Sequence, residues 1–115
     1  MSEDKKIEIK KGTTYNGRTF FFSLNNAPLN LTMTDIIITF VYDIYYKENT
    51  ARTGIDTVVL TIGDGVSNVV PLNGEFTMLS DTIINWAKGK WNYEVKFIFP
   101  DDSVKIWYEN TLWIV

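Results

Sequence analysis

Two runs of alternating apolar and polar residues occupy the C-terminal part of the chain, from Gly89 to Val115. In the first run, every second residue is aromatic or β-branched: Trp91, Tyr93, Val95, Phe97 and Phe99. A period of two gives a β-strand one apolar face and one polar face. The residues Pro100–Ser103 have the composition of a turn, and a second alternating run begins at Val104. The sequence therefore predicts a long β-hairpin whose apolar face the rest of the chain must cover.

Six shorter segments with strand character precede this hairpin, and turn-forming residues separate them. They are Ile7–Ile9, Arg18–Leu24, Ile36–Tyr46, Thr57–Ile62, Val66–Leu72 and Glu75–Leu79. Short strands with turn signals between them are typical of a β-sandwich. The predicted fold is all-β: an antiparallel, immunoglobulin-like sandwich of seven or eight strands.

A different spacing occurs between the last two predicted strand regions. Ser80 and Asp81 are both favourable N-cap residues, and Gly89 suits a C-terminal cap. The apolar residues between them recur at helical intervals: Ile83, Ile84 and Ala87. The pattern predicts one short helical connector near 81–88.

The chain has 115 residues, which fits a single domain. We expect a flexible polar tail at 1–6 and one domain over 7–115. The charged N-terminus has no apolar region behind it, so no signal peptide is predicted. No apolar run approaches the roughly 20 residues that span a bilayer, so we expect no membrane partner.

The charge and the residue types missing from the chain narrow the chemistry. A net charge of -3 argues against nucleic acid as a partner. The chain has no cysteine and no histidine, which removes thiolate catalysis, the usual zinc sites and Ser-His-Asp catalysis. The neighbouring acids Asp101 and Asp102 lie in a predicted turn that offers neither burial nor a close partner. Asp64 lacks the ligand spacing of a calcium loop. We therefore expect no enzyme, no metal and no cofactor.

Two tryptophans of the last strand, Trp107 and Trp113, have the parity opposite to its apolar residues. If the strand is regular, both face outward with Val115, as a candidate protein interface or a platform for sugar. If a bulge near Glu109–Asn110 changes the parity, one of them is buried instead. The sequence leaves both possibilities open. Protein contact is favoured over sugar, because no carboxamides and acids cluster beside the rings in the sequence.

A second candidate contact edge consists of three tyrosines at the end of the long Ile36–Tyr46 segment: Tyr42, Tyr45 and Tyr46. The polar segment Lys47–Asp56 follows them and predicts a loop. The alternative is that this loop packs over the strand end, so that the tyrosines contribute to the domain rather than to a partner.

Six motifs of mainly turn chemistry follow one another in a recognisable order. They are Lys10–Thr14, Ala27–Thr32, Leu60–Val66, Asn73–Phe76, Lys88–Val95 and Phe99–Asp102. This order resembles the immunoglobulin-like module at the N-terminus of phage baseplate upper proteins, which also occurs in other tail and fibre proteins. The resemblance covers most of the chain and is loose. Asn30 stands where the family usually has Asp, and both Met33 and Asp102 stand where Gly is common.

The resemblance implies a non-enzymatic phage virion structural protein. Such a protein would be an adaptor or decoration module of the capsid, baseplate or tail fibre, made in the host cytoplasm and located in the virion. Its expected partners are other virion proteins, including further copies of itself. The alternative is a carbohydrate-binding β-sandwich that uses surface Trp and Tyr residues, with a glycan as the partner.

Overall fold

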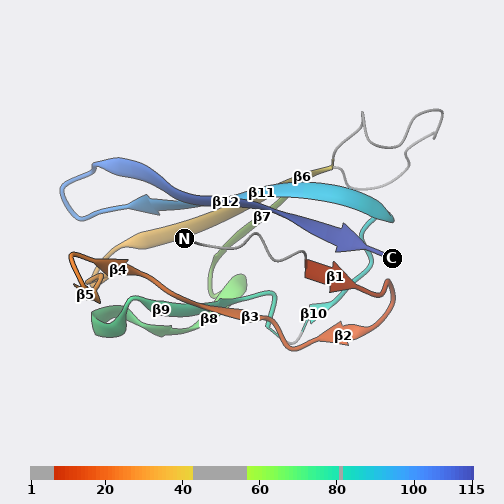
Figure 1. Ribbon diagram of the computed structural model, residues 1–115, viewed down its shortest axis with the longest axis horizontal. Coiled ribbons are helices and arrows are strands. Elements are labelled where there is room, and N and C mark those ends of the chain that lie inside the picture. Colours follow the sequence, from red (N-terminus) through yellow and green to blue (C-terminus); the bar gives the residue numbers. More distant parts are fainter. Residues whose placement is uncertain (1–6, 43–56, 81) are drawn as a thin grey trace.

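The computed structural model describes residues 7–42, 57–80 and 82–115, and the regular secondary structure of these ranges is almost entirely β (Figure 1). The predicted all-β class is confirmed, and the predicted tail at 1–6 lies outside the described residues. The elements are β1 (Ile7–Ile9), β2 (Thr14–Tyr15), β3 (Arg18–Phe21), β4 (Ser23–Leu24), β5 (Ala27–Pro28), β6 (Asp35–Tyr42), β7 (Thr57–Ile62), β8 (Gly65–Val70), the 3-10 turn η1 (Pro71–Asn73), β9 (Glu75–Met78), β10 (Thr82–Ile83), β11 (Gly89–Ile98) and β12 (Val104–Ile114).

Eight of the strands form one hydrogen-bonded sheet in the order β1-β12-β11-β6-β7-β8-β9-β3. The sheet curls, so that its two ends face each other (Figure 1). We name the part from β1 to β7 the β11 half, and the part from β8 to β3 the β9 half. Two small two-stranded sheets, β10-β2 and β4-β5, complete the described structure.

The sheet is mixed, so the prediction of a purely antiparallel fold was wrong for two strand pairs. β1 runs parallel to β12, and β7 runs parallel to β8. The second pair arises at the corner where the chain passes from one half to the other. There the Thr61 N–H donates to the Asp64 carbonyl at 3.0 Å, and the Gly63 N–H donates to the Val66 carbonyl at 3.0 Å. This tight turn sets the start of β8 beside the end of β7 in the same direction.

The predicted helical connector near 81–88 is also wrong for the residues that the structure describes there. Thr82–Ile83 form strand β10, which pairs with β2. The Ile84 N–H donates to the Thr13 carbonyl at 3.0 Å, and the Ile84 carbonyl accepts from the Gly12 N–H. The segment Gly12–Tyr15 thus provides the hydrogen-bond partners that the backbone N–H and carbonyl groups would otherwise find within a helix. Tertiary pairing of this kind overrides a weak helical spacing.

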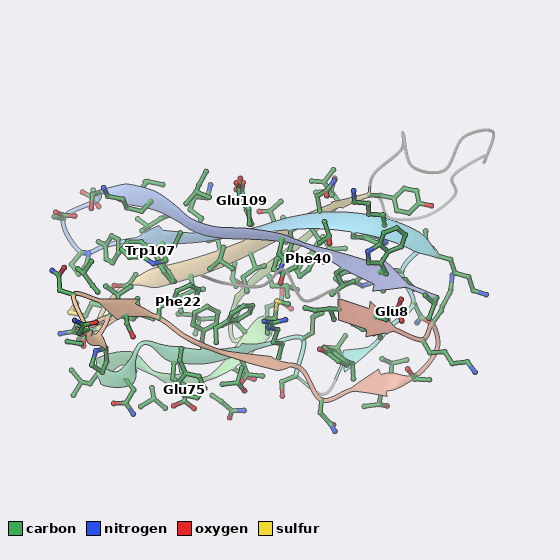
Figure 2. All side chains as sticks on the ribbon, in the orientation of Figure 1. Glu8, Phe22, Phe40, Glu75, Trp107 and Glu109 are labelled. Atoms are coloured by element: carbon green, nitrogen blue, oxygen red, sulfur yellow. The ribbon has the colours of Figure 1, made fainter. Side chains whose placement is uncertain are left out.

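The core lies between the two halves and is rich in aromatic rings (Figure 2). The predicted hairpin forms, and the alternate residues of β11 that face inward are fully or almost fully buried: Trp91, Tyr93, Val95 and Phe97. The ring of Phe22, which directly follows β3, stacks on the Phe76 ring of β9 with centroids 5.6 Å apart. Both rings meet the Phe97 ring edge-on. The aromatic contacts therefore join the two halves across the interior.

Candidate functional site

The pairing of β11 with β12 has one irregularity, which lies at Trp107. Val95 is opposite Tyr108 and Lys96 is opposite Ile106, so Trp107 is an extra residue in β12. An extra residue of this kind is a β-bulge, and it reverses the side to which the side chains beyond it point. The bulge that the sequence allowed near Glu109–Asn110 therefore exists, but closer to the hairpin turn.

The bulge turns Trp107 toward the interior instead of outward (Figure 2). Its ring is partly buried, with centroids 5.9 Å from Phe97 and 6.3 Å from Phe99. In exchange, Val104 and Ile106 turn outward, and each is 55% exposed. Of the two tryptophans, Trp107 thus belongs to the inner face.

Trp113 lies beyond the bulge and keeps the outward direction expected of it. It is half-buried and is opposite Lys90 of β11 and Glu8 of β1. Val115 follows it with a half-exposed side chain. Its backbone continues the pairing with the first strand, because its N–H donates to the Ile9 carbonyl and its carbonyl accepts from the Lys11 N–H, both at 2.9 Å.

The proposed tyrosine edge is wrong for Tyr42 and lies outside the described residues for Tyr45 and Tyr46. Tyr42 is buried, and its hydroxyl donates to the Lys88 carbonyl at 2.7 Å. Its ring meets the Trp91 ring edge-on with centroids 5.2 Å apart. Tyr42, the last residue of β6, is therefore part of the core rather than of a contact edge.

The outward-facing side chains of β1, β12, β11 and β6 form a surface that we name the β11 face. Near its middle is a shallow depression, where Glu94 of β11 is directly opposite Glu109 of β12. Figure 2 shows the Glu109 side chain on the outer side of the sheet. Polar groups from neighbouring positions complete the lining: Thr39, Asn92, Asn110 and Thr111. Carboxylates, the Asn92 carboxamide and hydroxyls that are scattered in the sequence thus meet on one side of the sheet, whereas Asn110 is opposite the buried Tyr93 and accepts from the Thr111 N–H.

Like charges directly opposite each other on a sheet face are unfavourable. Neither the Glu94 side chain nor the Glu109 side chain forms a hydrogen bond or an ion pair with another described residue. Exposed aliphatic side chains border this acidic pair. Val41 is 46% exposed and Val59 is 51% exposed, each beside the depression on β6 or β7, and Ile106 lies toward the hairpin turn. The middle of the β11 face therefore has an acidic pair and apolar side chains, and Lys96, which is opposite Ile106, lies next to them toward the hairpin turn.

The end of the β11 face beyond Trp113 is basic. Lys10 is opposite Val115, because the backbone of Val115 forms hydrogen bonds with Ile9 and Lys11, the two neighbours of Lys10. Lys10 is exposed and, by alternation with buried Ile9, points to the same side as Glu8. Lys88 is exposed at the same end, next to Gly89, which is opposite Ile114. The face thus has an acidic middle, Trp113 next, and a basic end.

A separate apolar groove lies at the opposite end of the molecule, between the β4-β5 hairpin and the turn of the β11-β12 hairpin. Its apolar lining comes from Leu24, Leu29, Phe99, Pro100 and Trp107. Asp101 is at its rim and accepts hydrogen bonds from the Ser103 N–H at 3.0 Å and the Ser103 hydroxyl at 2.6 Å. These bonds lower the pKa of Asp101 below its usual value. Its carboxylate closes the hairpin turn, as the turn composition indicated.

Sequence reasoning missed the acidic pair, although a signal for it existed. Glu94 and Glu109 both have the polar parity of their strands and lie six residues from the turn at Pro100–Ser103, so the sequence places them at similar heights on one face; the bulge at Trp107 then sets them directly opposite each other. Among the described residues, no cluster of three or more acidic side chains is placed to hold a metal ion, and no helix has the length and apolarity to cross a membrane. Comparison of the chain with family models, curated proteins and solved structures found no match.

Proposed function

We propose that this chain is a non-enzymatic, immunoglobulin-like structural module of a phage virion, an adaptor or decoration part of the capsid, baseplate or tail fibre that acts through protein contacts. The observation that carries the contact role is the β11 face. Trp113 and exposed aliphatic side chains lie there on regular paired strands, which hold them in fixed positions. Tryptophans on rigid surfaces are frequent anchors of protein interfaces.

The strand order supports the immunoglobulin-like part of the proposal. In that fold, strands B, E and D form one layer, and strands C, F and G form the other, with C′ added beside C in variable-type domains. If β3 is taken as strand B, the same pairs occur in this chain. β3 pairs with β9 and β9 with β8, while β12, β11, β6 and β7 follow one another as G, F, C and C′ would.

The backbone at two turn positions supports the family resemblance. Met33 and Asp102 stand where the phage module usually has glycine. Both have positive φ, 57° for Met33 and 68° for Asp102, in the left-handed region that glycine adopts most readily. The chain therefore keeps the turn geometry that glycine would favour at both positions, which is a reason to align it with the family there.

Particle purification tests the virion role. Phage particles banded on a density gradient and analysed by quantitative mass spectrometry should contain the chain in a fixed ratio to the major capsid or tail protein. That ratio should survive a second gradient. If the chain stays in the host lysate while other virion proteins band with the particle, the proposed function is wrong.

A carbohydrate-binding role is a second candidate, because the depression collects the groups that usually bind sugars. The Glu94 and Glu109 carboxylates and the Asn92 carboxamide lie on the same face as Trp113, although they are not neighbours of Trp113 in the sequence. A glycan array with the purified chain, followed by titration of its hits against the wild type and Asn92→Ala, tests this role. Binding that Asn92→Ala weakens would favour a glycan, whereas an array without hits would remove this candidate.

A further inference from the structure

We propose that the β11 face is a self-interface, on which a second copy of the chain docks in the reverse direction about a two-fold axis near Trp113. In this dimer the basic end of each copy lies over the acidic middle of the other. This inference deepens the proposed function, on which it rests, by naming a partner, the chain itself. It also gives a role to the acidic pair.

The charges on the face are arranged for such a contact. Moving along the face from its middle, the outward residues form rows: Glu94 with Glu109, then Asn92 with Thr111, then Lys90 with Trp113 and Glu8. The exposed residues Lys10 and Lys88 form the last row at the end of the face. A two-fold axis that lies in the interface, between the Asn92–Thr111 row and the Lys90–Trp113 row, places the Glu94–Glu109 row of one copy over the Lys10 and Lys88 row of the other. Each acidic pair then meets lysines of the other copy.

The groups that would meet are unpaired within one copy. Among the described residues, no ion pair involves Glu94, Glu109, Lys10 or Lys88. The like-charged pair is a cost in the isolated chain. Opposite charges from a second copy would remove that cost, and complementary charges of this kind also fix the register of an interface.

The apolar groups of the face are placed to support the same contact. Trp113 lies in a row next to the axis, so the two copies would bring their tryptophans close to the centre of the interface. Central aromatic residues carry much of the binding energy in many interfaces. A two-fold interface needs one patch that is complementary to itself, and two-fold dimers are the commonest oligomers.

Charge reversal with rescue tests this proposal on the full chain. The variant Glu94→Lys/Glu109→Lys and the variant Lys10→Glu/Lys88→Glu should each lose self-association by at least about 100-fold, because like charges then face each other. An equimolar mixture of the two variants should form a heterodimer, since every reversed charge meets its opposite. Glu75→Lys is the matched control, because Glu75 lies on β9, on the side of the molecule opposite the β11 face (Figure 2).

Sedimentation equilibrium, at protein concentrations up to about 1 mM, measures each dissociation constant. Recovery of the dimer in the mixture, with the control unchanged, supports the proposal. A wild type that stays monomeric, or a dimer that both reversals leave intact, overturns it. If the wild type is monomeric and virions nevertheless contain the chain, the self-interface is wrong and the virion role stands. If the dimer behaves as expected and virions lack the chain, the virion role is wrong and the self-interface stands.

Discussion

Replacing Trp107 and Trp113 separately by alanine should produce opposite patterns of damage. The Trp107 ring packs on Phe97 and Phe99 at the edge of the core. A buried tryptophan removes about 150–250 Å² of surface from water, at roughly 25 cal/mol per Å². Because Trp107 is only partly buried beside an open groove, we expect Trp107→Ala to lower the free energy of unfolding by about 2–3 kcal/mol.

Trp113 lies on the outer face and contacts its neighbours from one side only. Cross-strand pairs on a sheet face contribute about 0.2–1 kcal/mol each. Trp113→Ala should therefore lower the free energy of unfolding of the monomer by no more than about 1 kcal/mol. Self-association should respond in the reverse order, with a marked loss for Trp113→Ala and none for Trp107→Ala.

Urea unfolding measures the free energy of unfolding of each variant. Far-UV circular dichroism is the signal, because it follows the β-structure rather than the fluorescence of the replaced tryptophan. Sedimentation equilibrium on the same samples measures the dissociation constant of the dimer. Trp107→Phe serves as a control that keeps a ring in the groove and should recover about half of the lost stability. The reasoning about the bulge fails if Trp113→Ala destabilises the monomer as much as Trp107→Ala does.

Three further predictions follow from single features of the structure. Glu94→Gln/Glu109→Gln should raise the stability of the monomer by a few tenths to about 1 kcal/mol while weakening the dimer, as urea melts and sedimentation would show; a loss of monomer stability would contradict the repulsion argument. Gly89→Ala should lower the free energy of unfolding by about 2–4 kcal/mol in urea melts, because φ at Gly89 is +132° and an added Cβ would lie 2.8 Å from the Tyr42 hydroxyl oxygen. Tyr42→Phe in the same chain should relieve part of this loss, and full additivity of the two changes would argue against the contact. Met33→Gly should stabilise by about 0.5–1 kcal/mol in thermal melts, since Met33 is 85% exposed with φ of 57°; an unchanged or lower melting temperature would show that the turn carries no strain.

The strands that alternate strictly were the part of the fold that could be predicted from the sequence. β11 has the inward residues that its pattern indicated, because a period of two over ten residues admits one way to bury the aromatic side chains. The segment 82–88 was mispredicted for the opposite reason. Its three apolar residues fit a helix locally, but the Gly12–Tyr15 segment offered the backbone a partner that is distant in the sequence.

The candidate site depended on details that local patterns do not contain. One extra residue in β12 decided that Trp107 faces inward and Ile106 outward, and a bulge leaves no clear mark in the alternation. Tyr42 was predicted to be an edge residue because local sequence does not reveal its hydrogen-bond partner. That partner, the Lys88 carbonyl, lies in a later part of the chain. The acidic depression required the register of the hairpin, which joins residues on both sides of a turn.

The parallel pairing of β1 with β12 has a mechanical consequence. Ile7 is opposite Leu112 and Ile9 is opposite Ile114, so a force that separates Ile7 from Ile114 pulls the two strands along their length in opposite directions. The hydrogen bonds between them are then loaded together, whereas a force across the strands would break them one after another. Pulling experiments should therefore record a higher unfolding force with handles at these two residues than with one handle moved to the turn at Pro100–Ser103. The domain would then resist tension along the direction of its first and last strands.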